Sequence, residues 1–156
     1  MKKGLTLLEV IISLGMLAVI MSVVLPVMGW LITRSRQLEY ENQAGVVMAA
    51  GMEVAYNVLL ADWDKAVAGG TYQIGVELKS DGSREWTLVS GSGLVQSRFT
   101  RWVEVSQVCR DGQSGERKDC GQGTADVNSK LLKTSVKWME KQTEKTIGSE
   151  LLVVRL

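Results

Sequence analysis

The first residues of the chain place a carboxylate where it needs a partner. Glu9 stands immediately before an apolar run from Val10 to Ile32. As a helix this run would be roughly 35 Å long at about 1.5 Å per residue, which is enough to cross a bilayer. A carboxylate at the head of such a segment is costly to bury unless a cation pairs with it. Cleavage of the chain after Gly4 would free an α-amine on Leu5, which is a cation of the kind that such a carboxylate requires.

The same residues resemble a known N-terminal signature. The stretch Lys2-Lys3-Gly4 followed by Leu5-Thr6-Leu7-Leu8-Glu9-Val10 is similar to the class III leader and first mature residues of type IV pilins and type II secretion pseudopilins. Pro26 also stands at the position that proline has in that family. The resemblance covers residues 1–36, and it implies a structural subunit of a type IV pilus or a related pseudopilus.

The resemblance also implies what each residue does. A prepilin peptidase would cleave between Gly4 and Leu5, the new Leu5 terminus would be N-methylated, and Glu9 would pair with the Leu5 amine of a neighbouring subunit. The implied partners are the peptidase, the membrane before assembly, and other pilin subunits through the N-terminal helix. Two residues depart from the family: Leu5 replaces its usual Phe, and Ala18 replaces a Gly common in the helix of major pilins.

Two other interpretations of this segment stay open. A secretory signal peptide also has a basic start, and Val27-Met28-Gly29 loosely resembles a cleavage site, but its apolar core should be only about 7–15 residues long. A plain membrane anchor for an extracytoplasmic binding domain that never assembles fits the length. Neither interpretation explains Gly4 and Glu9 together.

Small residues follow the apolar run at helical spacing. Gly15, Ser22 and Gly29 recur every seven residues, with Ala18 three residues after Gly15. They predict one stripe along which another helix could approach closely. Pro26 has no backbone N–H and crowds the carbonyl of Ser22, which predicts a kink or a weakened turn.

The only two cysteines bear on the location of the chain. Basic residues flank the apolar run equally on both sides, so they do not set its orientation. Cys109 and Cys120 are spaced for a local disulfide in an oxidising compartment, worth about 3 kcal/mol if geometry allows; free thiols or half a metal site are the alternatives. A disulfide favours a single-pass protein of the cytoplasmic (inner) membrane with an extracytoplasmic C-terminal domain, later part of a cell-surface or periplasmic filament.

Four segments are expected along the chain: a leader over 1–4, a membrane-spanning or filament-core helix over 5–33, its continuation over 34–61, and an antiparallel β domain with a disulfide loop over 62–156. The continuation has one apolar face, and its expected members are Val47, Gly51, Val54 and Val58, broadened by Met48, Met52, Tyr56 and Leu59. This face should pack on the domain.

After Gly70 the apolar period changes towards two, which indicates strands. Residues 72–78 and 85–89 predict a hairpin around a turn at 80–83. Further strands are predicted over 99–108, 132–139 and 151–156, with a connection of charged and turn residues over 140–149. The fold class is therefore α+β: a pilin-like long N-terminal helix whose distal half packs against a C-terminal antiparallel sheet.

Short stretches of the distal half resemble the globular part of PilV-like minor pilins and of I-type pseudopilins. They are Asp62-Trp63, Gly70-Thr71-Tyr72, Phe99-Thr100-Arg101, Val108-Cys109-Arg110-Asp111 and Ser135-Val136-Lys137-Trp138. The resemblance favours a minor subunit over a major one. It does not distinguish pili for adhesion or motility from machines for DNA uptake or type II secretion.

Little in the chain points to catalysis. No histidine is present, and Gly112-Gln113-Ser114-Gly115 lacks the strand-turn-helix context of a nucleophile elbow. We expect no enzyme activity, no cofactor and no metal. A calcium site on Asp62 and Asp64, or on Asp111, Asp119 and Asp126, stays an alternative because calcium favours carboxylate-rich turns.

Nucleic acid is not favoured as a partner. Loss of Lys2 and Lys3 with the leader leaves 16 of the 18 basic residues against 17 acidic ones, so no general attraction for phosphate is expected. Arg98, Arg101 and Arg110 with Trp102 would form a basic face with a stacking ring. Arg98 and Arg101, however, should point to opposite faces of one strand.

Overall fold

A computed structural model of the chain describes residues 6–155. Helix α1 spans Leu7–Ala61, and a short 3-10 helix, η1, follows at Trp63–Lys65. The chain divides into two compact units, Met1–Glu41 and Asn42–Leu156. The second unit contains the end of α1 and an antiparallel sheet, which confirms the predicted α+β class.

In the first unit α1 is apolar and uncovered. Residues 6–36 are all exposed, and the helix is long and apolar enough to cross a membrane. Its polar side chains bond to the helix itself: the hydroxyls of Ser13, Ser22 and Thr33 donate to backbone carbonyl oxygens one turn earlier, at 2.7, 2.7 and 3.0 Å. A helix that faces lipid requires such hydrogen bonds within the helix, because no water is present to bond its polar groups.

The sheet of the second unit has the strand order β2-β1-β4-β6-β7, with β3 and β5 also paired to β4. All pairs are antiparallel. The strands are β1 Gly70–Leu78, β2 Arg84–Ser90, β3 Gly93–Val95, β4 Phe99–Arg110, β5 Arg117–Lys118, β6 Thr124–Glu140 and β7 Thr143–Val154. The predicted hairpin of residues 72–78 and 85–89 is therefore confirmed as β1 and β2.

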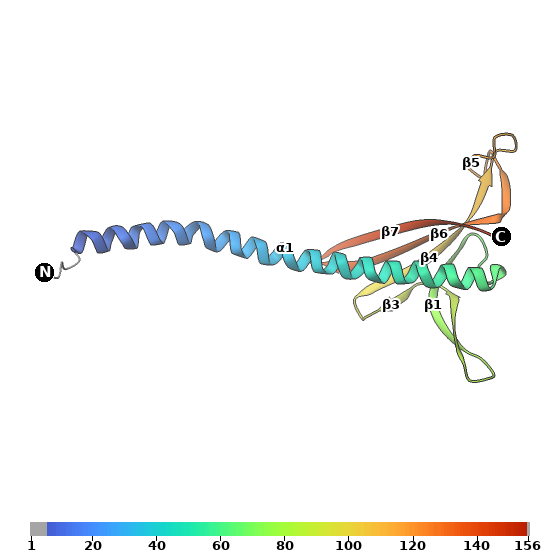
Figure 1. The fold of residues 1–156 in the computed structure, drawn as a ribbon, viewed down its shortest axis with the longest axis horizontal. Coiled ribbons are helices and arrows are strands. Elements are labelled where there is room, and N and C mark those ends of the chain that lie inside the picture. The colour runs from blue at the N-terminus through green and yellow to red at the C-terminus, as the bar shows by residue number, and fades with distance from the viewer. Residues whose placement is uncertain (1–5, 156) are drawn as a thin grey trace. The chain divides into compact units, whose positions relative to one another are not determined.

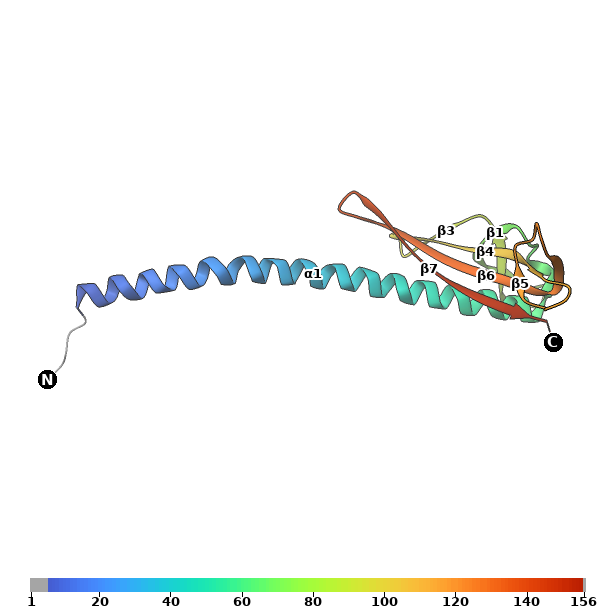
Figure 2. The ribbon, with the colours of Figure 1, turned by 90° about the horizontal axis from the view of Figure 1, so that it is seen from above.

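Within this unit the C-terminal part of α1 lies along one face of the sheet (Figures 1 and 2). The helix presents small residues to the strands: Ala44, Val47, Gly51, Ala55 and Val58 are buried. A Cβ atom on Gly51 would lie 2.7 Å from Cδ of Arg101 and 3.1 Å from Cγ2 of Thr134, so glycine permits this close approach.

The core lies between the helix and the sheet. The distal turns of α1 contribute Leu59, and the strands contribute the buried side chains of Val103, Val105, Leu132 and Val153. Trp63 of η1 closes the end of this core. The hydroxyl of Tyr72 accepts a hydrogen bond from the N–H of Val67 at 2.8 Å and donates to its carbonyl at 3.1 Å, which fixes the turn between η1 and β1.

The last two strands are much longer than predicted. Strand β6 begins at Thr124, eight residues before the expected Leu132, and β7 begins at Thr143. The expected connection over 140–149 is therefore wrong: Lys141 and Gln142 alone form the turn, with φ of 45° and 71°. The charged residues that suggested a loop lie on an exposed edge strand, where they remain in water.

The predicted helical face also needs correction. Tyr56 is 37% exposed and does not belong to it. Ala44 and Ala55, which are both fully buried, were not included in the prediction. Ala44 and Ala55 occupy this face because they are small, since the helix lies close to the sheet there.

The β6–β7 turn generates a stability prediction. Two-residue hairpin turns with positive φ at both positions favour Asn-Gly, so replacing Lys141→Asn together with Gln142→Gly should relieve backbone strain. We expect the free energy of unfolding to rise by about 0.5–1 kcal/mol. Thermal unfolding of the full chain in detergent, followed by circular dichroism, measures the change.

The matched control exchanges the two native residues, Lys141→Gln with Gln142→Lys, and should leave the midpoint unchanged. An unchanged or lower midpoint for the Asn-Gly variant would contradict the strain assigned to this turn.

Candidate functional site

The residues expected to direct processing and assembly lie at the start of α1. Gly4 and Leu5 fall outside the described residues. Glu9 lies in the first turn of the helix and is exposed. None of residues 6–155 forms an ion pair or a hydrogen bond with its carboxylate, so within the described chain this charge has no partner.

The backbone around Glu9 shows a second role that the sequence analysis missed. The carbonyl oxygen of Thr6 accepts hydrogen bonds from the N–H groups of Glu9 and Val10, at 3.0 and 3.3 Å. The Thr6 hydroxyl also accepts from the Glu9 N–H at 3.4 Å. Thr6 and Glu9 therefore have the positions of a capping box, in which Ser or Thr precedes Glu or Gln by three residues. The three-residue spacing of Thr6 and Glu9 is the sequence signal from which this cap could have been predicted.

Pro26 lies inside α1, and the helix continues through it. The missing N–H of proline leaves the carbonyl of Ser22 without its usual donor, so the weakened turn remains a prediction. The small residues Gly15, Ala18, Ser22 and Gly29 are exposed. Nothing within 4 Å would obstruct a Cβ atom on Gly15 or Gly29, so this stripe is open to another helix.

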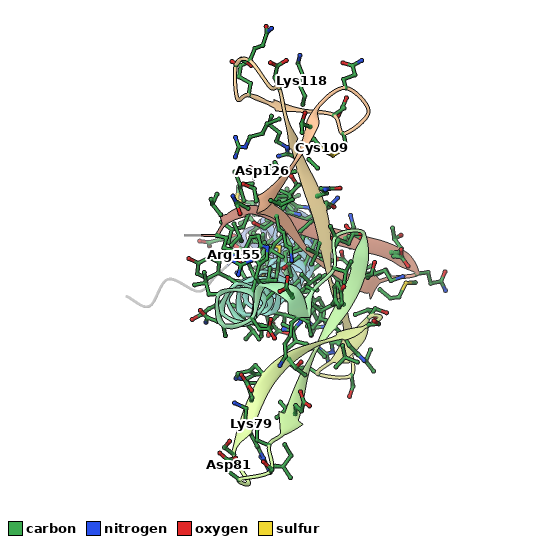
Figure 3. The ribbon with its side chains drawn as sticks, turned by 90° about the vertical axis from the view of Figure 1, so that its right-hand side faces the viewer. Lys79, Asp81, Cys109, Lys118, Asp126 and Arg155 are labelled. Carbon is green, nitrogen blue, oxygen red and sulfur yellow. A yellow bond between two sulfur atoms is a disulfide. The ribbon has the colours of Figure 1, made fainter. Side chains whose placement is uncertain are left out.

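The predicted disulfide between Cys109 and Cys120 is present, with a Cα–Cα distance of 5.0 Å. It joins the end of β4 to the loop that precedes β6. Cys109 is buried and Cys120 is exposed. Figure 3 shows Cys109 and Lys118 on a projection at one side of the sheet, opposite the β1–β2 hairpin that carries Lys79 and Asp81.

Polar contacts hold the loop that the disulfide closes. The carboxylate of Asp111 accepts hydrogen bonds from the Lys118 ammonium group and from the N–H groups of Gln113 and Ser114. The Lys118 bond, followed by those backbone bonds, lowers the pKa of Asp111 to about 2. The carboxylate thus orders both sides of the loop.

A second ion pair ties the loop to the sheet. Arg110 Nε donates to Asp126 Oδ2 at 2.7 Å, and its Nη1 donates to the carbonyl oxygen of Gly115 at 3.1 Å. Hydrogen bonds from Ser129 and then from Arg110 lower the pKa of Asp126. Asp111 and Asp126 are therefore already paired with Lys118 and Arg110 of the same chain. Within residues 6–155 no group of three or more His, Cys, Asp or Glu residues is arranged to hold a metal ion.

The residues weighed for nucleic-acid binding do not form one basic face. Arg101 turns towards α1, where its Nη1 donates to the carbonyl oxygen of Val47 at 3.2 Å, and burial lowers the pKa of Arg101. Trp102, the next residue of β4, points to the other face of the sheet. Arg98 precedes β4, so the expectation that it and Arg101 lie on one strand is wrong.

Sequence reasoning also missed a cation that contacts η1, the short helix after α1. The ammonium group of Lys130 donates to the carbonyl oxygens of Trp63 and Ala66, the latter at 2.8 Å. It also lies 4.7 Å from the centre of the Trp63 ring. Burial lowers the pKa of Lys130. Its position more than sixty residues from the helix in sequence left no local signal.

Comparisons with family models, with curated proteins and with solved structures found no match.

The disulfide loop generates a pH prediction. Because the pKa of Asp111 is about 2 in the folded chain and ordinarily 3.8, its stabilising contribution is complete above the unfolded-state pKa. It should be lost as the pH falls from about 4 towards 2. The Asp111→Asn variant should lack this part of the acid-induced loss of stability.

The measurement compares unfolding midpoints of both proteins between neutral pH and pH 2. Asp119→Asn is the matched control, because the Asp119 carboxylate has no hydrogen-bond or ion-pair partner within the described loop. Identical acid profiles for wild type and Asp111→Asn would contradict the role given to Asp111.

Proposed function

We propose that this chain is a structural, non-catalytic subunit of a type IV pilus or a related pseudopilus, and that it acts as a minor subunit. The start of α1 carries the proposal. An exposed apolar helix of membrane length has one carboxylate in its first turn, without a partner in the described chain. The same helix continues into a small disulfide-bonded domain.

Glu9 places an ionisable carboxylate in the first turn of the apolar helix. An ionised carboxylate within an apolar assembly is stabilised by a nearby cation, and the Coulomb energy of that pair is large where water is excluded. The N-methylated amine of a neighbour's Leu5 would supply the cation after removal of residues 1–4. The pair would then align adjacent subunits, while the small stripe beside Gly15 lets their helices approach.

The subunit would be stored in the membrane before it assembles. Its apolar helix requires surroundings without water, and the intrahelical bonds of Ser13, Ser22 and Thr33 suit such surroundings. The disulfide favours an oxidising compartment for the C-terminal domain. Cleavage by a prepilin peptidase would then release the subunit into a cell-surface or periplasmic filament.

The capping box permits a sharp test of Glu9. Glu9→Gln keeps a residue that can complete the capping box but removes the charge, so incorporation into filaments should fall by at least about tenfold. Thr6→Ala weakens the cap by about 1 kcal/mol and should retain incorporation. The measurement is the ratio of subunit in sheared filaments to subunit in membranes.

Normal incorporation of Glu9→Gln would exclude the ion pair. If Glu9→Ala and Thr6→Ala then failed together, Glu9 would act only as a helix cap.

Processing has its own test. Mass spectrometry of the native protein should find a chain that begins at N-methylated Leu5. A chain that retains Met1 would support a plain membrane anchor, and a chain that begins near Trp30 would support a secretory signal peptide. Either result would overturn the proposed function.

A further inference from the structure

The β1–β2 hairpin carries an apolar face that nothing in the described chain covers. Val76 and Trp86 are cross-strand partners, and Leu78 follows on the same face. These three side chains are 53%, 56% and 68% exposed. Val76, Arg84, Glu85 and Trp86 line a hollow of about 350 Å³. A tryptophan on such a face is typical of an interaction surface.

This surface continues the face on which α1 packs. Tyr72 and Leu88 lie on the same face nearer the base of the hairpin, where both are buried in the core with Ala55 and Val58 of the helix. Beyond them the hairpin projects past the helix (Figure 3). The helix α1, which contacts the sheet through small side chains, therefore covers only part of this sheet face. A second helix with small side chains suits the uncovered part on the hairpin.

The second unit offers such a helix surface. The side of α1 that faces away from the sheet has a stripe of exposed residues at helical spacing. Its members are Val46, Ala49, Ala50, Glu53, Asn57 and Leu60. Like the buried side, this stripe is rich in small and apolar side chains, which permit a close approach.

The charges on the two surfaces are complementary. The hairpin face contains Arg84, the cross-strand partner of Leu78, and the helix stripe contains Glu53. Neither side chain has an ion-pair or hydrogen-bond partner among residues 6–155. The neighbouring charges of the hairpin are already paired, because Lys79 lies 2.8 Å from Glu85.

We propose that the hairpin face of one copy docks on the α1 stripe of a second copy, with Arg84 of one opposite Glu53 of the other. The two surfaces lie on different elements, so the contact is heterologous. A heterologous contact repeats from copy to copy and builds an open chain unless it closes into a ring. The inference deepens the proposed filament function by naming the contact between globular domains. The contact itself does not require cleavage of the leader.

Cysteine cross-linking of the full-length chain in membranes tests the contact. Differently tagged copies carrying Val76→Cys and Asn57→Cys are co-expressed with no other pilin and mildly oxidised. We expect a mixed dimer, little dimer from either variant alone, and a ladder of oligomers from the double variant. Val89→Cys, on the opposite face of β2, is the control that replaces Val76→Cys and should give no mixed dimer.

The charge pair is tested in the same assay. Arg84→Glu and Glu53→Arg should each lower the yield of mixed dimer about fivefold, and both changes together should restore it. Equal cross-linking of Val89→Cys, or dimers from each single variant alone, would overturn the heterologous contact. Because unprocessed chains serve in this assay, failure here is distinguishable from failure of the processing and Glu9 experiments.

Discussion

The close approach of α1 to the sheet is the constraint on which the C-terminal unit depends. Small side chains on one side of the helix, with Gly51 at the tightest point, let its backbone lie near Arg101 and Thr134. Larger side chains would separate the two layers and leave the core between them underpacked. Beyond the end of α1, Lys130 of the sheet donates hydrogen bonds to the carbonyl oxygens of Trp63 in η1 and of Ala66, the residue that follows η1.

The N-terminal part of α1 is subject to a different constraint. Its large apolar side chains are exposed, and the helix is long and apolar enough to cross a membrane. Polar residues suit such a helix only by bonding within it, as Ser13 and Thr33 do. Glu9 is the exception, because its carboxylate finds no such bond in the described chain. One continuous helix therefore combines two surfaces that require different surroundings.

The sequence predicted the elements whose signals are local. The end of α1, the β1–β2 hairpin and the disulfide follow from periodicity, turn residues and cysteine spacing. It failed at β7, whose early residues are polar because that strand lies at an edge, and at a turn made without Asn or Gly. The hydrogen bonds of Arg101 and Lys130 could not be predicted either, since their partners are more than fifty residues away in the chain. At Glu9, the capping spacing was visible but was not used.

The unequal burial of the two cysteines sets an order for oxidation. Cys109 lies within the sheet, while Cys120 lies on the exposed loop. An oxidising enzyme reaches an accessible thiol first, and the second thiolate then attacks the mixed disulfide. In a chain whose sheet has already formed, the enzyme would form a mixed disulfide with the exposed Cys120. The buried thiol of Cys109 would then displace the enzyme and complete the disulfide. In this order, the disulfide would close the loop only after the strand that holds Cys109 has joined the sheet.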